Sequence, residues 1–178
     1  IKDYKKMITM DFKQVDNIVL VIGKTEGHID QSLLARNILN EKNGPPPEVN
    51  LFNEKNNGET VLKLIDAGHI KSAHDVSIGG IITAVSKMCI KGNKGINLKK
   101  PKYLINEIEY YFGEDQSRYI IEVSKDSLKK VTDILNKNAV HFDELGTINE
   151  DQLFVNEKTK VSIDELITWN TNWLINYM

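Results

Sequence analysis

The sequence predicts an α/β (α+β) fold, built as a mixed β-sheet with helices packed mainly on one face. Two observations lead to this prediction. Short apolar runs of strand length alternate with segments whose apolar residues recur three and four positions apart, as on one face of a helix. The strand-like runs are joined partly by helices and partly by hairpin-length turns, which favours a mixed sheet. With 178 residues, of which 40% are hydrophobic, the chain can bury one core.

In the first half of the chain we expect a strand, two helices, a second strand and a third helix. They lie at residues 17–23, 30–40, 58–68, 70–76 and from Gly80 onward. Asp30 is the expected N-cap of the first helix, and Gly68 ends the second in the left-handed conformation common at helix C-termini. The prolines at 45–47 cannot continue a helix and indicate an ordered connection.

The helix that follows Gly80 has a clear amphipathic pattern. One buried face is predicted at Ile81, Ala84, Val85, Met88 and Cys89. The second half then predicts a helix at 103–113, a strand at 118–123 and an amphipathic helix at 124–138. Short strands are expected at 139–142, 145–148, 152–155 and 160–163, and a final helix opens with a capping box from Ser162 to Glu165.

Composition and charge argue against several classes of function. A formal net charge of −2 lacks the basic excess of a nucleic-acid-binding surface, and no apolar run is long enough to span a membrane. Cys89 is the only cysteine, which excludes an internal disulfide and suits a reducing, cytoplasmic location. The chain begins IKDYKKM, without an initiator Met or a signal-peptide pattern. We therefore expect a fragment of a longer chain, with 1–16 as a polar lead-in or linker and 17–178 as the domain.

Residues 72–87, SAHDVSIGGIITAVSK, contain the first candidate site. A strand that turns into a helix at Gly80 presents free backbone N–H groups, and glycines let an anion approach them closely. Asp75 can then hold Mg²⁺ together with phosphate oxygens, and Ser77 can donate a hydrogen bond to the same phosphate. The alternative is structural: the Gly79 and Gly80 pair satisfies the turn, Ser77 caps the helix and Asp75 interacts with its dipole.

A second cluster, FGEDQSRY at 112–119, has two interpretations as well. Arg118 follows two acids there, so its guanidinium can position a charged substrate or form a salt bridge that holds the turn. Only Arg36 and Arg118 are arginines, which leaves two candidates for bidentate recognition of phosphate. TEGHIDQS at 25–32 is another acid-glycine turn before a helix, and the same two interpretations apply.

The histidines and the cysteine are expected to be structural. His74 should point to the opposite face of its strand from Asp75, so an acid–base pair is not expected. None of the four histidines has a second ligand at a metal-binding spacing. Cys89 lies on an apolar helix stripe, where a thiol behaves as a small buried hydrophobe.

Several segments, taken in order, resemble the C-terminal domain of the phosphoribosylformylglycinamidine synthase family, part of the aminoimidazole ribonucleotide synthetase superfamily. They are LVIGKTEGHIDQSLL, GPPPEVNL, IKSAHDVSIGGIITAVSKM, FGEDQSRYIIEV and SIDELITWNTNWLINYM. The third is similar to the family's His-Asp-Val-Ser-Asp-Gly-Gly turn that leads into a helix. The resemblance covers roughly residues 17–178, and several weak motifs in the right order are more specific than any one of them.

The resemblance implies a domain like the C-terminal domain of aminoimidazole ribonucleotide synthetase, packed beside an ATP-binding domain of the same chain. It implies ATP and Mg²⁺ as cofactors and a reaction of purine biosynthesis. Formylglycinamide ribonucleotide, ATP and ammonia, released from glutamine by a glutaminase subunit or domain, give formylglycinamidine ribonucleotide, ADP and phosphate. This chemistry depends on positioning and charge neutralisation. The isolated domain would be inactive. The alternatives are a non-catalytic assembly domain or part of another ATP-dependent superfamily member, such as a small-molecule kinase.

The resemblance also implies which residues face the nucleotide or phosphate. They are Asp75, Ser77, Gly79, Gly80 and Arg118, with Asp75 also a candidate for Mg²⁺ held through the nucleotide. Two departures stand out: Ile78 replaces an Asp of the family motif, and HIDQS replaces a turn rich in glycine and serine. Because the family enzyme has duplicated halves with reacting and degenerate clefts, this segment faces one or the other.

Overall fold

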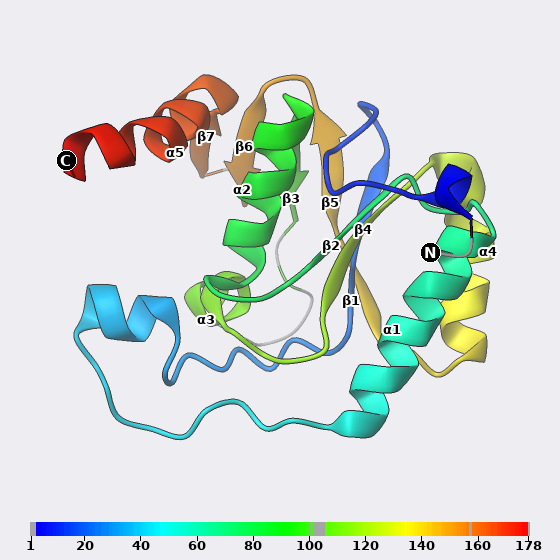
Figure 1. Cartoon of the computed structure of the whole chain (residues 1–178), viewed down its shortest axis with the longest axis horizontal. Helices are drawn as coiled ribbons and strands as arrows, with labels where there is room; N and C mark the ends of the chain where they lie inside the picture. Colours follow the sequence, from blue (N-terminus) through cyan, green and yellow to red (C-terminus); the bar gives the residue numbers. More distant parts are fainter. Residues whose placement is uncertain (1–2, 100, 102–105, 157, 178) are drawn as a thin grey trace.

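The computed structural model describes residues 3–99, 101, 106–156 and 158–177, and a seven-stranded β-sheet forms the centre of the fold (Figure 1). Its strands are β1 (Ile18–Ile22), β2 (Ser72–Asp75), β3 (Gly95–Leu98), β4 (Tyr119–Val123), β5 (Phe142–Asn149), β6 (Gln152–Val155) and β7 (Thr159–Ser162). They lie in the order β2-β4-β1-β5-β3-β6-β7. Neighbouring strands are antiparallel except β3 and β6, which are parallel. The predicted mixed α/β sheet is confirmed.

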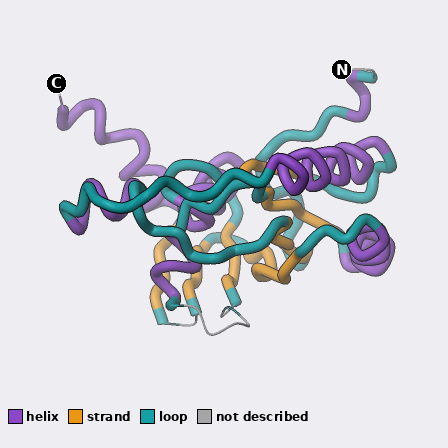
Figure 2. The backbone as a smooth tube through the Cα atoms, turned by 90° about the horizontal axis from the view of Figure 1, so that it is seen from below, coloured by secondary structure: helices purple, strands orange, loops and turns teal. Residues whose placement is uncertain are grey.

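Helices cover both faces of this sheet. The helices α1 (Leu51–Asp66) and α4 (Lys125–Lys137) lie side by side and pack on one face (Figures 1 and 2). The opposite face is covered by α2 (Gly80–Gly92), α3 (Glu107–Phe112) and the first turns of α5 (Ile163–Tyr177). Two short elements complete the fold, the 3-10 helix η1 (Tyr4–Lys6) and the π-helix η2 (Ala35–Leu39).

The central strand β1 shows why both faces are covered. Val19 and Val21 belong to the buried cluster under α2 and α3, whereas Leu20 and Ile22 belong to the cluster under α1 and α4. Successive side chains of a strand point to opposite faces, so a strand that is apolar throughout needs cover on both. In this respect the structure differs from the predicted arrangement with helices mainly on one face.

Two predicted helical features are confirmed in detail. The residues predicted for the stripe of α2 are all buried: Ile81, Ala84, Val85, Met88 and Cys89. Burial raises the pKa of the Cys89 thiol, which fits a packed hydrophobe better than a nucleophile. At the start of α5, Glu165 N donates to Ser162 Oγ at 3.2 Å and Ser162 N donates to Glu165 Oε2 at 3.0 Å, which is the reciprocal pattern of a capping box.

Segment 30–50, called the arm below, departs most from prediction. The helix expected at 30–40, with Leu33, Leu34 and Ile38 on one side, is reduced to the π-helical element η2, and Leu33 and Ile38 are 39% and 69% exposed. Both views show the arm extending away from the sheet and returning to the start of α1 (Figures 1 and 2). A long loop with little regular structure is often functional.

The other differences concern element limits. Helix α1 begins at Leu51, capped by Asn50, earlier than the expected start at residue 58. The described part of the helix expected at 103–113 is α3, and residues 103–105 lie outside the described residues. Strand β3 was not predicted, because four residues after a turn give little pattern. Among the described residues, no helix is both long and apolar enough to cross a lipid bilayer.

The N-terminal residues 9–17 form a strap packed on the domain. Phe12 is buried in the cluster beneath α2 with 1% exposure. The strap ends beside β5, where Asp16 N donates to Ile148 O at 3.0 Å. The segment suggested as a polar lead-in therefore contributes to the core.

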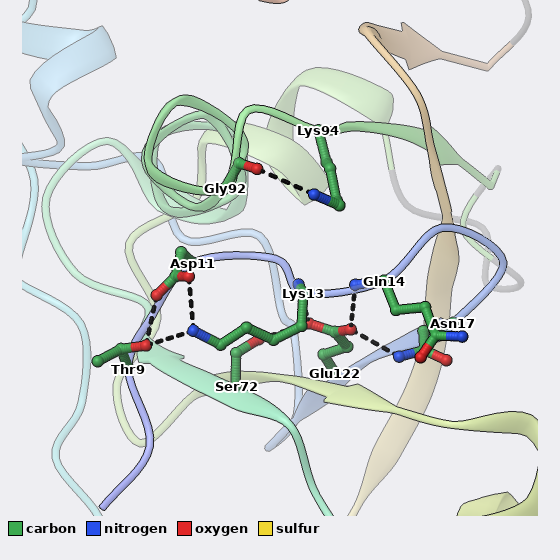
Figure 3. Close-up of polar contacts among 9 residues, drawn as sticks. All are labelled: Thr9, Asp11, Lys13, Gln14, Asn17, Ser72, Gly92, Lys94 and Glu122. Carbon is green, nitrogen blue, oxygen red and sulfur yellow. Dashed lines mark hydrogen bonds and ion pairs between the residues drawn. The ribbon is translucent and has the colours of Figure 1, made fainter.

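A buried carboxylate holds this strap on the sheet. Glu122 lies on β4 with no exposed surface (Figure 3). Its carboxylate accepts hydrogen bonds from Lys13 N at 2.8 Å, Gln14 N at 3.1 Å, Asn17 Nδ2 at 2.6 Å and Ser72 Oγ at 3.0 Å. Four donors compensate the desolvation of one charge, so Glu122 joins the strap to the sheet.

Candidate functional site

The chain passes from β2 to α2 through four residues, 76–79, called the crossover below. Gly79, its last residue, and Gly80, the first residue of α2, have φ angles of +82° and +68°, a left-handed conformation that favours glycine. A Cβ atom on Gly80 would lie 2.7 Å from the carbonyl oxygens of Tyr111 and Gly113. The two glycines are therefore required by the turn and by the close approach of the backbone around Gly113.

The polar residues of this region are accessible. The side chain of Asp75 is 65% exposed, and Ser77 is exposed beside Ile78. The predicted separation of His74 and Asp75 is wrong, because His74 Nδ1 lies 3.1 Å from Asp75 Oδ1. Asp75 is the last residue of β2, where strand alternation no longer fixes the side chain. Burial lowers the pKa of His74, and the neighbouring carboxylate only partly opposes this effect.

Arg118 lies inside the turn at residues 113–118 and is buried with 2% exposure. Its Nη2 donates to Gly113 O at 2.6 Å, and its Nε donates to Asp115 O at 3.2 Å. Nη1 reaches Thr25 Oγ1 at 3.3 Å and lies 3.4 Å from Asp115 Oδ2. Burial lowers the pKa of Arg118, and Asp115 opposes that shift. In this geometry the guanidinium holds the turn, which is the structural interpretation of the cluster.

The same turn is joined to the loop at 24–28. The carboxylate of Asp115 accepts hydrogen bonds from Gly27 N and His28 N, both at 3.1 Å. Glu114 N in turn donates to His28 O at 2.8 Å. These contacts fix the main chain of the 113–118 turn against its neighbour.

The side chain of Glu114 reaches from this turn to the crossover. Its Oε1 accepts hydrogen bonds from Gly79 N at 2.9 Å and from Leu33 N at 2.7 Å. Gly80 N donates to Ser77 O at 3.0 Å. The two glycine N–H groups that the sequence offers to a phosphate are therefore satisfied within the protein, and an internal carboxylate occupies one of them.

Two adjoining cavities open beside these segments. The larger, called the acidic cleft, has a volume of about 640 Å³ and lies between the 24–30 loop, the start of α1 and the 113–118 turn. Its described lining includes one lysine, Lys24, and five carboxylates: Glu26, Asp30, Glu48, Glu109 and Asp115. This charge balance disfavours a phosphate.

The second cavity, called the crossover groove, has a volume of about 510 Å³ and lies between the crossover and the arm. Its described lining includes Arg36 of the arm, Ser77 and Ile78 of the crossover, and two carboxylate residues of the 113–118 turn, Glu114 and Asp115. Among the described residues, the guanidinium of Arg36 has no hydrogen-bond or ion-pair partner. The sequence named both arginines as possible phosphate ligands and favoured Arg118. Their rarity was the available signal, but only the fold shows that Arg118 is enclosed and Arg36 lines a cavity.

The described residues do not form a complete metal site. Within ranges 3–99, 101, 106–156 and 158–177, no group of three or more His, Cys, Asp or Glu side chains is placed to hold a metal ion. Asp75 supplies one exposed carboxylate. Since Mg²⁺ prefers six oxygen ligands, Asp75 could hold it only together with ligand oxygens and water.

Similar sequences extend along the whole chain. A protein-family model described as "AIR synthase related protein, C-terminal domain" matches residues 14–156. The phosphoribosylformylglycinamidine synthase subunit PurL of Pelagibacter ubique is 73% identical over 178 residues, which is 100% of this chain and 24% of that protein. The PurL subunit of Bartonella bacilliformis is 35% identical over the same length, again 24% of that protein. The chain therefore spans about a quarter of the length of these curated relatives.

Solved structures with the same fold are more distant in sequence. "T. maritima PurL complexed with FGAR" has a TM-score of 0.76 and 18% identity, and covers 92% of this chain and 30% of that chain. Thiamine-monophosphate kinase from Stenotrophomonas maltophilia has a TM-score of 0.57 and 14% identity, and covers 84% of this chain and 52% of that chain. At these identities the likeness shows the fold alone.

Proposed function

We propose that this chain, which belongs to the family of AIR synthase related proteins and matches their C-terminal domain, forms one wall of a phosphate-binding site in a phosphoribosylformylglycinamidine synthase. The observation that carries the proposal is the 73% identity to a PurL subunit along all 178 residues. The enzyme would be an ATP-dependent ligase that converts formylglycinamide ribonucleotide, ATP and glutamine-derived ammonia to formylglycinamidine ribonucleotide, ADP and phosphate.

The ligands of related structures support a phosphate-bearing substrate. Structures with the same fold are named as T. maritima PurL complexed with FGAR and with ATP. Both ligands carry phosphate groups, which a charged guanidinium and a hydroxyl bind well. In this chain Arg36 and Ser77 line the crossover groove together with two carboxylates, Glu114 and Asp115, that accept backbone N–H groups, whereas five carboxylates and one lysine line the acidic cleft. We assign the phosphate to the crossover groove.

The other expected residues receive roles that follow from their positions. Gly79 and Gly80 shape the turn into α2 and let the backbone around Gly113 approach closely, but their own N–H groups already donate to acceptors within the protein. Asp75 is exposed at the end of β2, where it can share a Mg²⁺ ion with the nucleotide. Arg118 acts through the turn that it holds, not by touching the ligand.

Exposed apolar side chains near the groove support a partner domain. Leu33 and Ile78 lie beside the hydrogen bonds that Glu114 accepts from the arm and the crossover, and are 39% and 61% exposed. Ile38 and Leu39 of the arm are 69% and 50% exposed. Apolar patches of this kind are typical of protein contacts. We propose that the ATP-binding domain of the same chain covers them.

A glutaminase is a further proposed partner, since a related structure is named "PurLQS from Thermotoga maritima". A cytoplasmic location fits this reaction.

Steady-state kinetics of the full-length enzyme test the assignment. Arg36→Gln should raise KM for the phosphate-bearing substrate by about tenfold or more, because a charge-assisted contact is lost. Ser77→Ala should have a smaller effect in the same direction. Lys42→Gln removes a positive charge from the same arm outside either cavity and serves as the matched control. Unchanged kinetics in both groove variants would favour a non-catalytic assembly domain instead.

A further inference from the structure

We infer that Glu114 is a positioning residue, which ties the arm to the crossover and so keeps Arg36 opposite Ser77 across the crossover groove. The inference rests on the proposed function, in which the crossover groove binds the phosphate. Glu114 would set the distance between the two walls of that groove. Glu114 is half-buried and belongs to neither of the two segments that it joins.

The turn that carries Glu114 is a rigid support. Its main chain is fixed by the hydrogen bond from Glu114 N to His28 O at 2.8 Å. The next residue, Asp115, is 8% exposed and accepts two backbone N–H groups of the 24–28 loop. The buried Arg118 side chain donates a hydrogen bond to Gly113 O and so stabilises the turn. A side chain that projects from such a base has a well-defined position.

One oxygen atom of Glu114 joins two segments that are distant in sequence. Leu33 N, 81 residues away, donates to Oε1 at 2.7 Å, and Gly79 N, 35 residues away, donates to the same atom at 2.9 Å. Hydrogen bonds from backbone N–H groups to a carboxylate are stronger than neutral ones. The arm and the crossover are therefore held at a fixed separation by a single bridging atom.

The bridge matters because both groove residues lie close to its ends. Arg36 follows Leu33 by one turn of helical backbone, and Ser77 precedes Gly79 by two residues. Beyond Leu33 the arm is held by buried Ala35, by a hydrogen bond between His28 Nε2 and Pro45 O at 2.9 Å, and by hydrogen bonds from Gln31 Nε2 to the carbonyl oxygens of residues 42 and 44; the rest runs as an exposed loop to α1. Loss of the bridge removes the atom that links the two walls of the groove directly, so the separation of Arg36 and Ser77 is less well fixed and their joint contact with one phosphate weakens.

The shared acceptor atom gives a sharp test in the full-length enzyme. Glu114→Gln keeps an oxygen that can accept both N–H groups, whereas Glu114→Ala removes it and Glu114→Asp withdraws it by one methylene. We expect KM for the phosphate-bearing substrate to rise about tenfold in the Ala and Asp variants and to stay within about threefold in the Gln variant, with kcat little changed. Glu41→Ala removes an exposed acid of the same arm and is the matched control.

Hydrogen exchange separates this inference from the proposed function, because it needs no catalysis. The amides of Leu33 and Gly79 should exchange about tenfold faster in Glu114→Ala than in the wild type, while the amide of buried Ile121 in the sheet keeps its rate. Unchanged exchange, an unchanged KM, or a Gln variant as impaired as the Ala variant would each overturn the positioning role. A wild-type enzyme without the synthase activity would overturn the proposed function alone, since the exchange rates still decide whether Glu114 holds the arm.

Discussion

Alanine at Gly80 should destabilise the protein more than alanine at Gly68, although the two glycines have nearly the same backbone conformation. Their φ angles are +68° and +69°. An alanine in this left-handed region is disfavoured by about 1–2 kcal/mol, and the same cost applies at both positions. The two sites differ in their surroundings. A Cβ at Gly68 meets nothing within 4 Å, whereas a Cβ at Gly80 lies 2.7 Å from two carbonyl oxygens.

The magnitude of the difference follows from that contact. Both oxygens belong to the backbone of Tyr111 and Gly113, so no flexible side chain can move away. Overpacking of this kind costs about 1–3 kcal/mol beyond the conformational term. We therefore expect a loss of about 2–5 kcal/mol in the free energy of unfolding for Gly80→Ala and about 1–2 kcal/mol for Gly68→Ala. The larger loss is a considerable part of a typical domain stability of about 5–15 kcal/mol.

Urea unfolding followed by circular dichroism measures both losses. The slope of the transition should stay the same in the two variants, so that the midpoints report stability. Losses that agree within about 0.5 kcal/mol would refute the reasoning, because the contact at Gly80 is expected to add at least about 1 kcal/mol. The backbone of residues 111–113 would then not press against Gly80 at the start of α2.

Two further predictions concern the buried Glu122 and the half-buried His74. Glu122→Ala leaves four donors of the strap and sheet without an acceptor, and should lower the free energy of unfolding by about 3–5 kcal/mol and abolish hydrogen-exchange protection at Lys13 and Gln14. Burial lowers the pKa of His74 below its usual value of 6.5, so the unfolded chain binds the proton more readily than the folded protein. The stability that comes from neutral His74 is therefore complete above pH 6.5 and is lost as the pH falls below that value. Melting temperatures between pH 7.5 and 5.5 should therefore fall less in His74→Gln than in the wild type, and equal falls would contradict the shift.

Regular elements with strong periodicity could be predicted from the sequence. The stripe of α2 and the capping box of α5 follow from local patterns that tertiary packing reinforces. The distribution of the helices could not be read in the same way. The uninterrupted apolar run of β1 is compatible with cover on one or both faces until the neighbouring helices are placed. In the arm, by contrast, Leu33, Leu34 and Ile38 have helical spacing, but Leu33 and Ile38 are exposed, so the pattern did not predict their burial.

The candidate site was predicted as a set of residue types more than as a geometry. Asp75 and Ser77 are accessible as a ligand-binding segment requires, and the two glycines are needed by the turn. The sequence could not show that Glu114 would satisfy the N–H of Gly79, because the two residues are 35 positions apart. The sequence could not show that Arg118 is buried while Arg36 lines a cavity for the same reason, because burial depends on contacts between distant segments.

A crystal structure of the full-length protein with a bound nucleotide or formylglycinamide ribonucleotide tests the proposed phosphate site most directly. We expect a phosphate oxygen within hydrogen-bond distance of the Arg36 guanidinium and the Ser77 hydroxyl, with Glu114 still accepting hydrogen bonds from the arm and the crossover. A phosphate bound elsewhere, with Arg36 paired to a carboxylate of a neighbouring domain, would contradict it.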